Sequence, residues 1–199
     1  MGQKTVELFY DVGSTNSYFA LHLLRRLADR YDAQVVYQPF NLGYVFRSNN
    51  YVLMDESKAK LRNRKRDLMR WAARYDLPFQ MPEKFPIKTS PALRGALAAR
   101  QLGKEEEFLF AVFSSYWEEN DGRIDQLENL GRLAAGVGLD GAEFIRLAES
   151  AEIGQQLIES TNAALDRGVF GAPSMVVGDE LYWGKDRMEF IEDELKKTN

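Results

Sequence analysis

Two serines, Ser14 and Ser17, stand three residues apart where an apolar segment ends and a helical pattern begins, in the stretch YDVGSTNSYFAL. The first turn of a helix presents free backbone N–H groups and the positive end of the helix dipole. An anion such as a thiolate is stabilised there, and the Ser14 hydroxyl could donate one more hydrogen bond to it. An ordinary N-cap is the alternative and, taken alone, the commoner role of such a serine.

Two distant stretches also offer groups to a ligand. GVFGAPSMVV, residues 168–177, places a proline directly before an apolar segment. X–Pro bonds are cis in only ~5% of cases, so the local sequence favours a trans Ala172–Pro173 bond. A cis bond would open the Ala172 backbone to pairing with a peptide-like ligand. WGKDR, residues 183–187, could receive a carboxylate or an ammonium group, and a plain N-cap role for Asp186 is the alternative.

Two polar stretches have plainer explanations. KAKLRNRKR, residues 58–66, has six basic residues in nine and is typical of a solvated helix face. Local attraction of an anionic substrate is the alternative. FRSNNY, residues 46–51, offers Arg47 and two amides after the second strand, or is only a polar loop.

Composition limits the chemistry. The 199 residues include no cysteine, which excludes disulfides, cysteine metal sites and a protein thiol nucleophile, so any thiol must come from a ligand. The one histidine, His22, falls on the polar face of the first helix, about two turns from Ser14, which argues against a Ser–His–Asp triad. We expect no metal. The net charge of −4 and the lack of a long apolar run predict no nucleic acid, no membrane and a cytoplasmic protein.

The elements that must position these residues follow from periodicity. Residues 5–11 and 33–40 are predicted strands, and residues 15–31 are a predicted helix between them. Residues 56–165 are nearly all helical, with Ser90 as one N-cap. A hairpin over 173–184 and a helix over 186–197, capped by Asp186, complete the chain. The pattern predicts an α/β thioredoxin-like domain, residues 1–54 and 166–199, split by an all-helical insertion, residues 55–165.

Three stretches together resemble one family: FYDVGSTNSYFA, DLMRWAARYDLP and GVFGAPSMVVGDELYWGKDR. They resemble the 2-hydroxychromene-2-carboxylate isomerases, which belong with the kappa-class glutathione transferases and are built on the DsbA plan. The resemblance spans nearly the whole chain. It implies glutathione as cofactor, a small aromatic carboxylate as substrate, and a homodimer. The family usually has Ser-Pro-aromatic-Ser where this chain has Ser14-Thr15-Asn16-Ser17.

The resemblance also implies roles for individual residues. Ser14 is the catalytic residue that bonds the glutathione sulfur, and Ala172, before a cis Pro173, pairs with the cysteinyl backbone. Two further groups are implied: for glutathione, Trp183, Gly184, Lys185, Asp186, Arg187 and Asn50; for the substrate, Phe46, Arg47, Asn49 and Phe85. Phe46 and Phe85 fall where the family has a lysine and a tyrosine, so the substrate contacts are the weaker part of the match.

The implied reaction is the interconversion of 2-hydroxychromene-2-carboxylate and trans-o-hydroxybenzylidenepyruvate through transient thiolate addition. A bound thiol with a pKa lowered from about 8.5 towards neutrality would be ~10-fold more ionised at pH 7. Two other functions stay open. One is a kappa-type glutathione transferase or peroxidase, and the other is a non-catalytic thioredoxin-fold protein that binds peptides.

Overall fold

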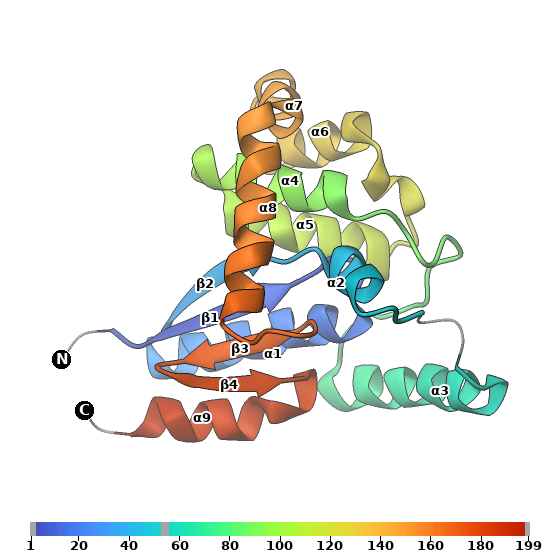
Figure 1. Ribbon diagram of the computed structural model, residues 1–199, viewed down its shortest axis with the longest axis vertical. Helices are drawn as coiled ribbons and strands as arrows, with labels where there is room; N and C mark the ends of the chain where they lie inside the picture. Colours follow the sequence, from blue (N-terminus) through green and yellow to red (C-terminus); the bar gives the residue numbers. More distant parts are fainter. Residues whose placement is uncertain (1–2, 53–55, 198–199) are drawn as a thin grey trace.

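The computed structural model describes residues 3–52 and 56–197. Four strands and the helices between and after them make up this part of the chain (Figure 1). The strands are β1 (Thr5–Tyr10), β2 (Gln34–Pro39), β3 (Ser174–Val177) and β4 (Glu180–Trp183); the α-helices are α1 (Thr15–Tyr31), α2 (Leu42–Ser48), α3 (Lys58–Tyr75), α4 (Ser90–Gln101), α5 (Glu105–Trp117), α6 (Leu127–Gly136), α7 (Gly141–Glu149), α8 (Ala151–Asp166) and α9 (Met188–Lys196); two 3-10 turns are η2 (Gly122–Asp125) and η3 (Lys185–Arg187).

The strands form one mixed sheet in the order β2-β1-β3-β4. β1 and β2 are parallel, with Leu8 opposite Tyr37, and α1 connects them as the predicted β-α-β unit. β3 is antiparallel to both β1 and β4, and Gly178 turns the predicted hairpin with a positive φ of 60°. The thioredoxin-like order of elements is thereby confirmed.

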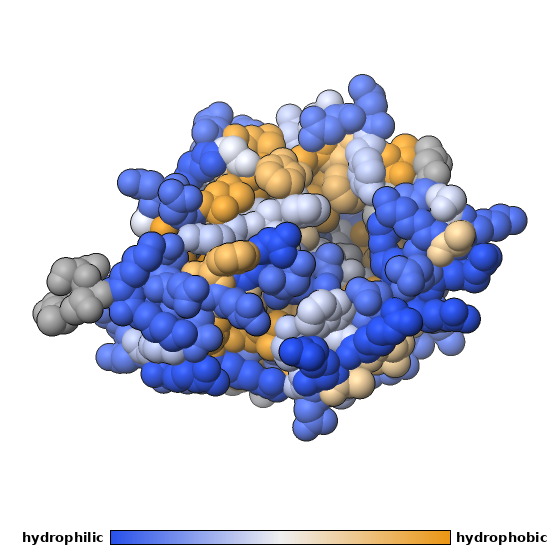
Figure 2. All heavy atoms as spheres, turned by 90° about the horizontal axis from the view of Figure 1, so that it is seen from below, coloured by the Kyte–Doolittle hydropathy of each residue, from blue (hydrophilic) through white to orange (hydrophobic). Residues whose placement is uncertain are grey.

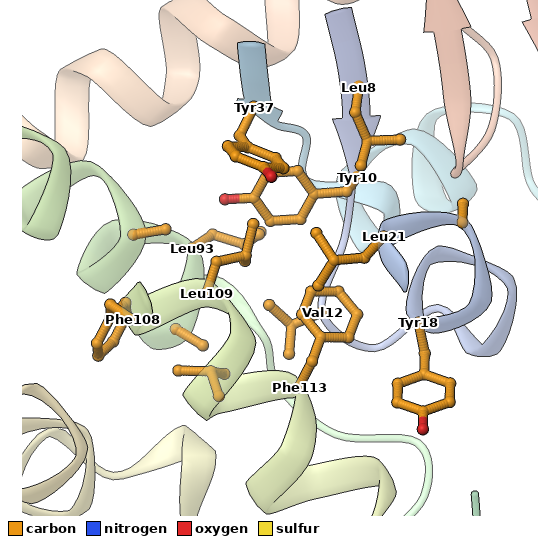
Figure 3. Close-up of a cluster of buried hydrophobic side chains, with 14 of the residues drawn as sticks. Leu8, Tyr10, Val12, Tyr18, Leu21, Tyr37, Leu93, Phe108, Leu109 and Phe113 are labelled. Atoms are coloured by element: carbon orange, nitrogen blue, oxygen red, sulfur yellow. The ribbon is translucent and has the colours of Figure 1, made fainter. Parts of the chain in front are cut away.

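The core lies between this sheet and the helices because β1 alternates its side chains. Leu8 and Tyr10 point to one face, where they meet residues of α1, α4 and α5, as Figure 3 shows. Phe9 points to the other face and joins a smaller cluster with Val45 of α2 and Ala164 of α8. Both faces of β1 are therefore buried, and its carboxyl end is held between two layers.

The aromatic face of α5 belongs to the core. Phe108, Phe113, Tyr116 and Trp117 of this helix are fully buried within the chain. Figure 1 shows α4 to α7 gathered above the sheet and α9 below it, beside β4. The aromatic side chains of α5 therefore fill the protein interior and do not form a surface for a second copy.

One alternative left open by the sequence and one local prediction do not hold in this part of the chain. The alternative of a polar loop fails for residues 46–48, which belong to α2, whose N-cap Asn41 accepts a hydrogen bond from the Tyr44 N–H at 3.0 Å. α4 is preceded by Thr89 as N-cap, and the predicted cap Ser90 is already the first helical residue. The Thr89 hydroxyl donates to Asp11 at 3.1 Å and leaves the α4 N-terminus without a side-chain cap.

The predicted division into two domains stays a prediction, and its boundary at residues 54–55 lies outside the described residues. Within residues 3–52 and 56–197, no helix is both long and apolar enough to cross a membrane.

Candidate functional site

Ser14 is the N-cap of α1 and lies between the end of β1 and the start of β3. Its Oγ accepts a hydrogen bond from the Ser17 N–H at 3.2 Å, as a helix cap does. The same hydroxyl donates to the carbonyl oxygen of Ala172 at 2.9 Å, across 158 residues of sequence. The cap and the long-range contact coexist, so the two interpretations of Ser14 are not exclusive.

The turn before Ser14 is organised by the buried carboxylate of Asp11. One oxygen accepts from the Gly13 N–H at 2.8 Å, and the other accepts from the Leu42 N–H at 2.9 Å and from the Thr89 hydroxyl at 3.1 Å. Burial raises the pKa of Asp11 to about 6, although the three donors oppose that rise. Asp11 thereby fastens the Ser14 turn to α2 and to the start of α4.

A second anchor of this turn is Trp117 of α5. Its indole Nε1–H donates to the Val12 carbonyl at 2.8 Å in a buried position. Position 13 in this turn has no room for a side chain, because a Cβ on Gly13 would lie 2.8 Å from Cγ2 of Thr89. Neither Asp11 nor Trp117 was singled out from the sequence. A charged residue within an apolar run, as in ELFYDV, is the signal that could have indicated Asp11.

We expect Trp117→Phe to lower the free energy of unfolding by roughly 2–3 kcal/mol, because it leaves the buried Val12 carbonyl unpaired and opens a small cavity. Urea denaturation measures the loss. Trp71→Phe is the matched control, since the Trp71 indole donates at 3.0 Å to Asp67, which is only part-buried. Its loss should stay below about 1 kcal/mol. Equal losses for the two variants would contradict the proposed anchoring of the Ser14 turn.

The Ala172–Pro173 peptide bond is cis, so the local expectation of a trans bond was wrong and the resemblance was right. The Gly184 N–H donates to the Pro173 carbonyl at 3.0 Å, which joins the 183–187 run to this loop. The Ser174 hydroxyl closes the loop from within by donating to the Gly171 carbonyl at 2.8 Å. The structure therefore brings Ser14, Ala172, Pro173 and Gly184 together.

The rest of the 183–187 run spreads around this point. Trp183 is half exposed and packs on Phe170, with ring centroids 5.2 Å apart. The Lys185 ammonium lies 4.6 Å from the ring centroid of Trp71 of α3. Asp186 pairs with the adjacent Arg187 at 2.7 Å. Arg187 is the N-cap of α9, so the predicted capping role of Asp186 was wrong, and its carboxylate is oriented toward the Arg187 guanidinium instead.

The four residues expected near the substrate lie in two places. Phe46 and Arg47 are in α2, and Phe46 packs edge-on against Tyr51 with ring centroids 4.8 Å apart. Asn49 and Asn50 follow the helix at the surface, and Asn50 has a positive φ of 52°. Phe85, which precedes a second cis proline, packs against Trp117 at 6.0 Å. None of these residues has a hydrogen bond to the Ser14 turn within the described part of the chain.

His22 is half-buried between Tyr18 and Phe110, so the predicted polar face of α1 is partly covered at this residue. Its Nε2 faces Glu118 at 3.6 Å, and burial lowers its pKa. Its partners are Tyr18 of α1, Phe110 of α5 and Glu118 just after α5, and it does not contact Ser14, as expected. No cluster of acidic or histidine side chains that could hold a metal ion occurs among residues 3–52 and 56–197.

A surface hollow of about 410 Å³ lies elsewhere, between β1, β2, α4 and α8, and includes none of the predicted site residues.

Comparison with known proteins agrees with this architecture. The family model described as "DSBA-like thioredoxin domain" matches residues 5–196. A 2-hydroxychromene-2-carboxylate isomerase of Sphingobium xenophagum is 32% identical over 194 residues, which cover 96% of this chain and 98% of that protein. Glutathione S-transferase kappa 2 of Caenorhabditis elegans is 26% identical over 96% of this chain and 91% of its own length. The solved structure of a 2-hydroxychromene-2-carboxylate isomerase superimposes with a TM-score of 0.85, at 28% identity, over 95% of this chain and 93% of that chain.

Proposed function

Because the chain belongs to the DsbA-like thioredoxin family, in the group of 2-hydroxychromene-2-carboxylate isomerases and kappa-class glutathione transferases, we propose that it is a glutathione-dependent isomerase of aromatic catabolism. Its reaction is the interconversion of 2-hydroxychromene-2-carboxylate, or a close analogue, and trans-o-hydroxybenzylidenepyruvate. An isomerase is what the relatives support. The observation that carries the proposal is the Ser14–Ala172 contact at a helix N-terminus in a chain without cysteine.

The residues at this point fit glutathione. A cysteinyl backbone needs a carbonyl partner, and the Ala172 oxygen accepts at this position already. A thiolate needs donors, and the first turn of the 17-residue α1 supplies backbone N–H groups together with the Ser14 hydroxyl. With no cysteine in the sequence, the chain cannot carry out thiol–disulfide exchange with its own side chains.

Binding requires one exchange of hydrogen bonds. The Ser14 hydroxyl has a single proton, which it gives to the Ala172 carbonyl. The hydroxyl can donate to a ligand sulfur only when it turns away from this carbonyl, whose oxygen remains available to accept a ligand N–H. The Ser17 N–H still donates to Ser14 Oγ and fixes the position of the oxygen during this rotation. Donation to the thiolate therefore takes the place of the Ser14–Ala172 hydrogen bond.

When bound, glutathione would be held at Ser14 and Ala172 and would supply a thiolate for reversible addition to the conjugated system of the substrate, which would allow the ring C–O bond to open and the former double bond to rotate before the thiolate leaves. The chain's own groups make this easier by holding the thiol ionised and the substrate oriented. We assign the substrate carboxylate to Arg47, and the remaining contacts to Phe46, Asn49 and Phe85. Asp186 and Arg187 are suited to the γ-glutamyl end of glutathione, because Asp186 is opposite in charge to its ammonium group and Arg187 to its carboxylate. Trp183, Gly184, Lys185 and Asn50 complete the proposed glutathione contacts.

Two further features belong to the proposal. Reduced glutathione is kept in the cytosol, so we place the reaction in the cytoplasm. We also propose a homodimer. A kappa-type transferase is the second candidate, because the relative in Caenorhabditis elegans carries that name and a lasting adduct begins with the same step. Since isomerases of similar length match almost the whole chain, a non-catalytic peptide-binding protein is no longer favoured.

Calorimetry with reduced glutathione tests the cofactor. We expect binding at submillimolar to millimolar concentration, and S-methylglutathione should bind more weakly because it cannot present a thiolate to Ser14. No heat at 10 mM glutathione, a concentration chosen for the test, would remove both the isomerase and the transferase. Turnover of 2-hydroxychromene-2-carboxylate, followed by absorbance, then separates the two, since only the isomerase returns glutathione unchanged.

A further inference from the structure

Helix α3 carries a large positive charge. Between Lys58 and Tyr75 the chain has eight Lys or Arg residues and one acidic residue, Asp67, for a formal charge of +7. The net charge of the whole chain is −4, so the remaining residues together carry −11. Such a separation of charge creates a local field even though the protein as a whole is acidic.

The charges on α3 are divided between two faces. Arg64 and Lys60 pair with Glu56, and Arg70 lies 3.6 Å from Asp67. Arg74 is also exposed but lies on another side of the helix. The four other exposed cations occupy one stripe with helical spacing, and none of these four forms an ion pair within the described part of the chain. This set, called the basic stripe below, consists of Lys58, Arg62, Lys65 and Arg66.

The buried face of α3 connects this helix to the site. Trp71, on that face, packs under the Lys185 ammonium at 4.6 Å, and Lys185 directly follows Gly184. The Gly184 N–H donates a hydrogen bond to the Pro173 carbonyl, and the neighbouring Ala172 carbonyl accepts one from the Ser14 hydroxyl. Figure 1 shows α3 on the same side of the molecule as α2, and in Figure 2 this side is mostly hydrophilic. α3 therefore approaches the candidate site through Trp71, and the basic stripe lies on the more N-terminal part of the same helix.

Lys185 extends the positive charge inward. The residue is only 8% exposed, and within the described chain its ammonium has no hydrogen-bond acceptor and no ion pair, only the face of the Trp71 indole. Burial lowers the pKa of this ammonium, while the more distant carboxylates of Asp186 and Asp67 raise it. A ligand carboxylate in this region would supply the missing counter-charge.

We propose that the basic stripe of α3 recruits carboxylate-bearing ligands to the Ser14 site, which deepens the proposed function and rests on it. The stripe lies on a helix ~27 Å long, and the Debye length is ~10 Å at 0.1 M salt, so its nearer charges act on the site only at low to moderate ionic strength. A role in nucleic-acid binding is less favoured, because no aromatic side chain alternates with the cations of the stripe.

The test uses a probe that requires neither glutathione nor turnover. Binding of trans-cinnamate, an aromatic carboxylate, and of its neutral amide is followed by quenching of tryptophan fluorescence at 20 and 500 mM NaCl. The variant is Arg62→Gln/Lys65→Gln/Arg66→Gln. The control, Lys104→Gln/Arg132→Gln/Arg146→Gln, changes the net charge equally on the α5, α6 and α7 side, away from α3.

We expect the stripe variant to bind cinnamate ~3- to 10-fold more weakly at 20 mM NaCl and equally at 500 mM. The affinity of the stripe variant for the amide should equal that of the wild type. The control variant should bind both ligands as the wild type does. The proposal is overturned if the wild type does not bind cinnamate, if the amide is weakened as much as the acid, or if the control variant behaves like the stripe variant.

An anionic membrane surface is the competing target of the basic stripe. Unchanged cinnamate affinity, together with loss of co-sedimentation on phosphatidylglycerol vesicles, would assign the stripe to a membrane surface and overturn ligand recruitment. Failure of the proposed function is read independently, from glutathione calorimetry on the wild type.

Discussion

Ser14→Ala is expected to lower kcat/KM for the isomerisation by roughly 10- to 100-fold at pH 7. A single donor to a developing anion is commonly worth about two powers of ten or more in rate. The effect here should be at the lower end, because the first-turn N–H groups of α1 remain in place. The apparent pKa of the bound thiol, measured from thiolate absorbance or from the pH–rate profile, should rise in the variant, since the charged form has lost a hydrogen bond.

Ser17→Ala is the matched control for this variant. It removes the same hydroxyl three residues further along α1, where the Ser17 Oγ is buried and has no hydrogen-bond partner among the described residues. We expect this variant to keep wild-type turnover and a wild-type thiol pKa. Ser14→Ala should also lose ~1 kcal/mol of stability through its cap. If stability falls while turnover and thiol pKa stay unchanged, Ser14 is only a cap.

Asp11→Asn is expected to change the pH dependence of stability. The pKa of Asp11 is 3.8 in the unfolded chain and about 6 in the folded protein. Below the lower value both states hold the proton, so the folded state keeps the full contribution. As the pH rises through 6, the folded protein must ionise a buried group and this contribution is lost. Each pKa unit corresponds to ~1.4 kcal/mol, so the loss is roughly 3 kcal/mol between about pH 3.5 and 7.5.

The asparagine variant cannot ionise at this position and should not show that loss. Urea denaturation of both proteins across this pH range measures the difference, and the stability of the wild type relative to the variant should fall as the pH rises. If the two plots of stability against pH are parallel, the hydrogen bonds from Gly13, Leu42 and Thr89 offset the rise in pKa that burial causes at Asp11. Should the variant fail to fold, infrared titration of the Asp11 carboxyl in the wild type gives its pKa directly.

The sequence determined most of the secondary structure and much of the candidate chemistry. Apolar runs rich in β-forming residues predicted β1 and β2, and helical spacing predicted α1, because these signals depend only on local sequence and backbone geometry. The lack of cysteine excluded a protein thiol without reference to any fold. Short polar signals were less reliable. Ser90 and Asp186 both had the residue type of a cap, yet Thr89 and Arg187 hold those positions, since other hydrogen bonds decide where a helix begins.

Only the tertiary structure decided how the site is assembled. The Ser14 hydroxyl meets the Ala172 carbonyl 158 residues later, and no local pattern predicts such a contact. The carboxylate of Asp11 and the indole of Trp117 fix the Ser14 turn through partners from other elements, so their role appears only once those elements have packed. The sequence alone thus defined which groups could act on a thiol. The fold decided which of them lie together, because long-range contacts are set by the packing of the sheet and helices and not by residue type.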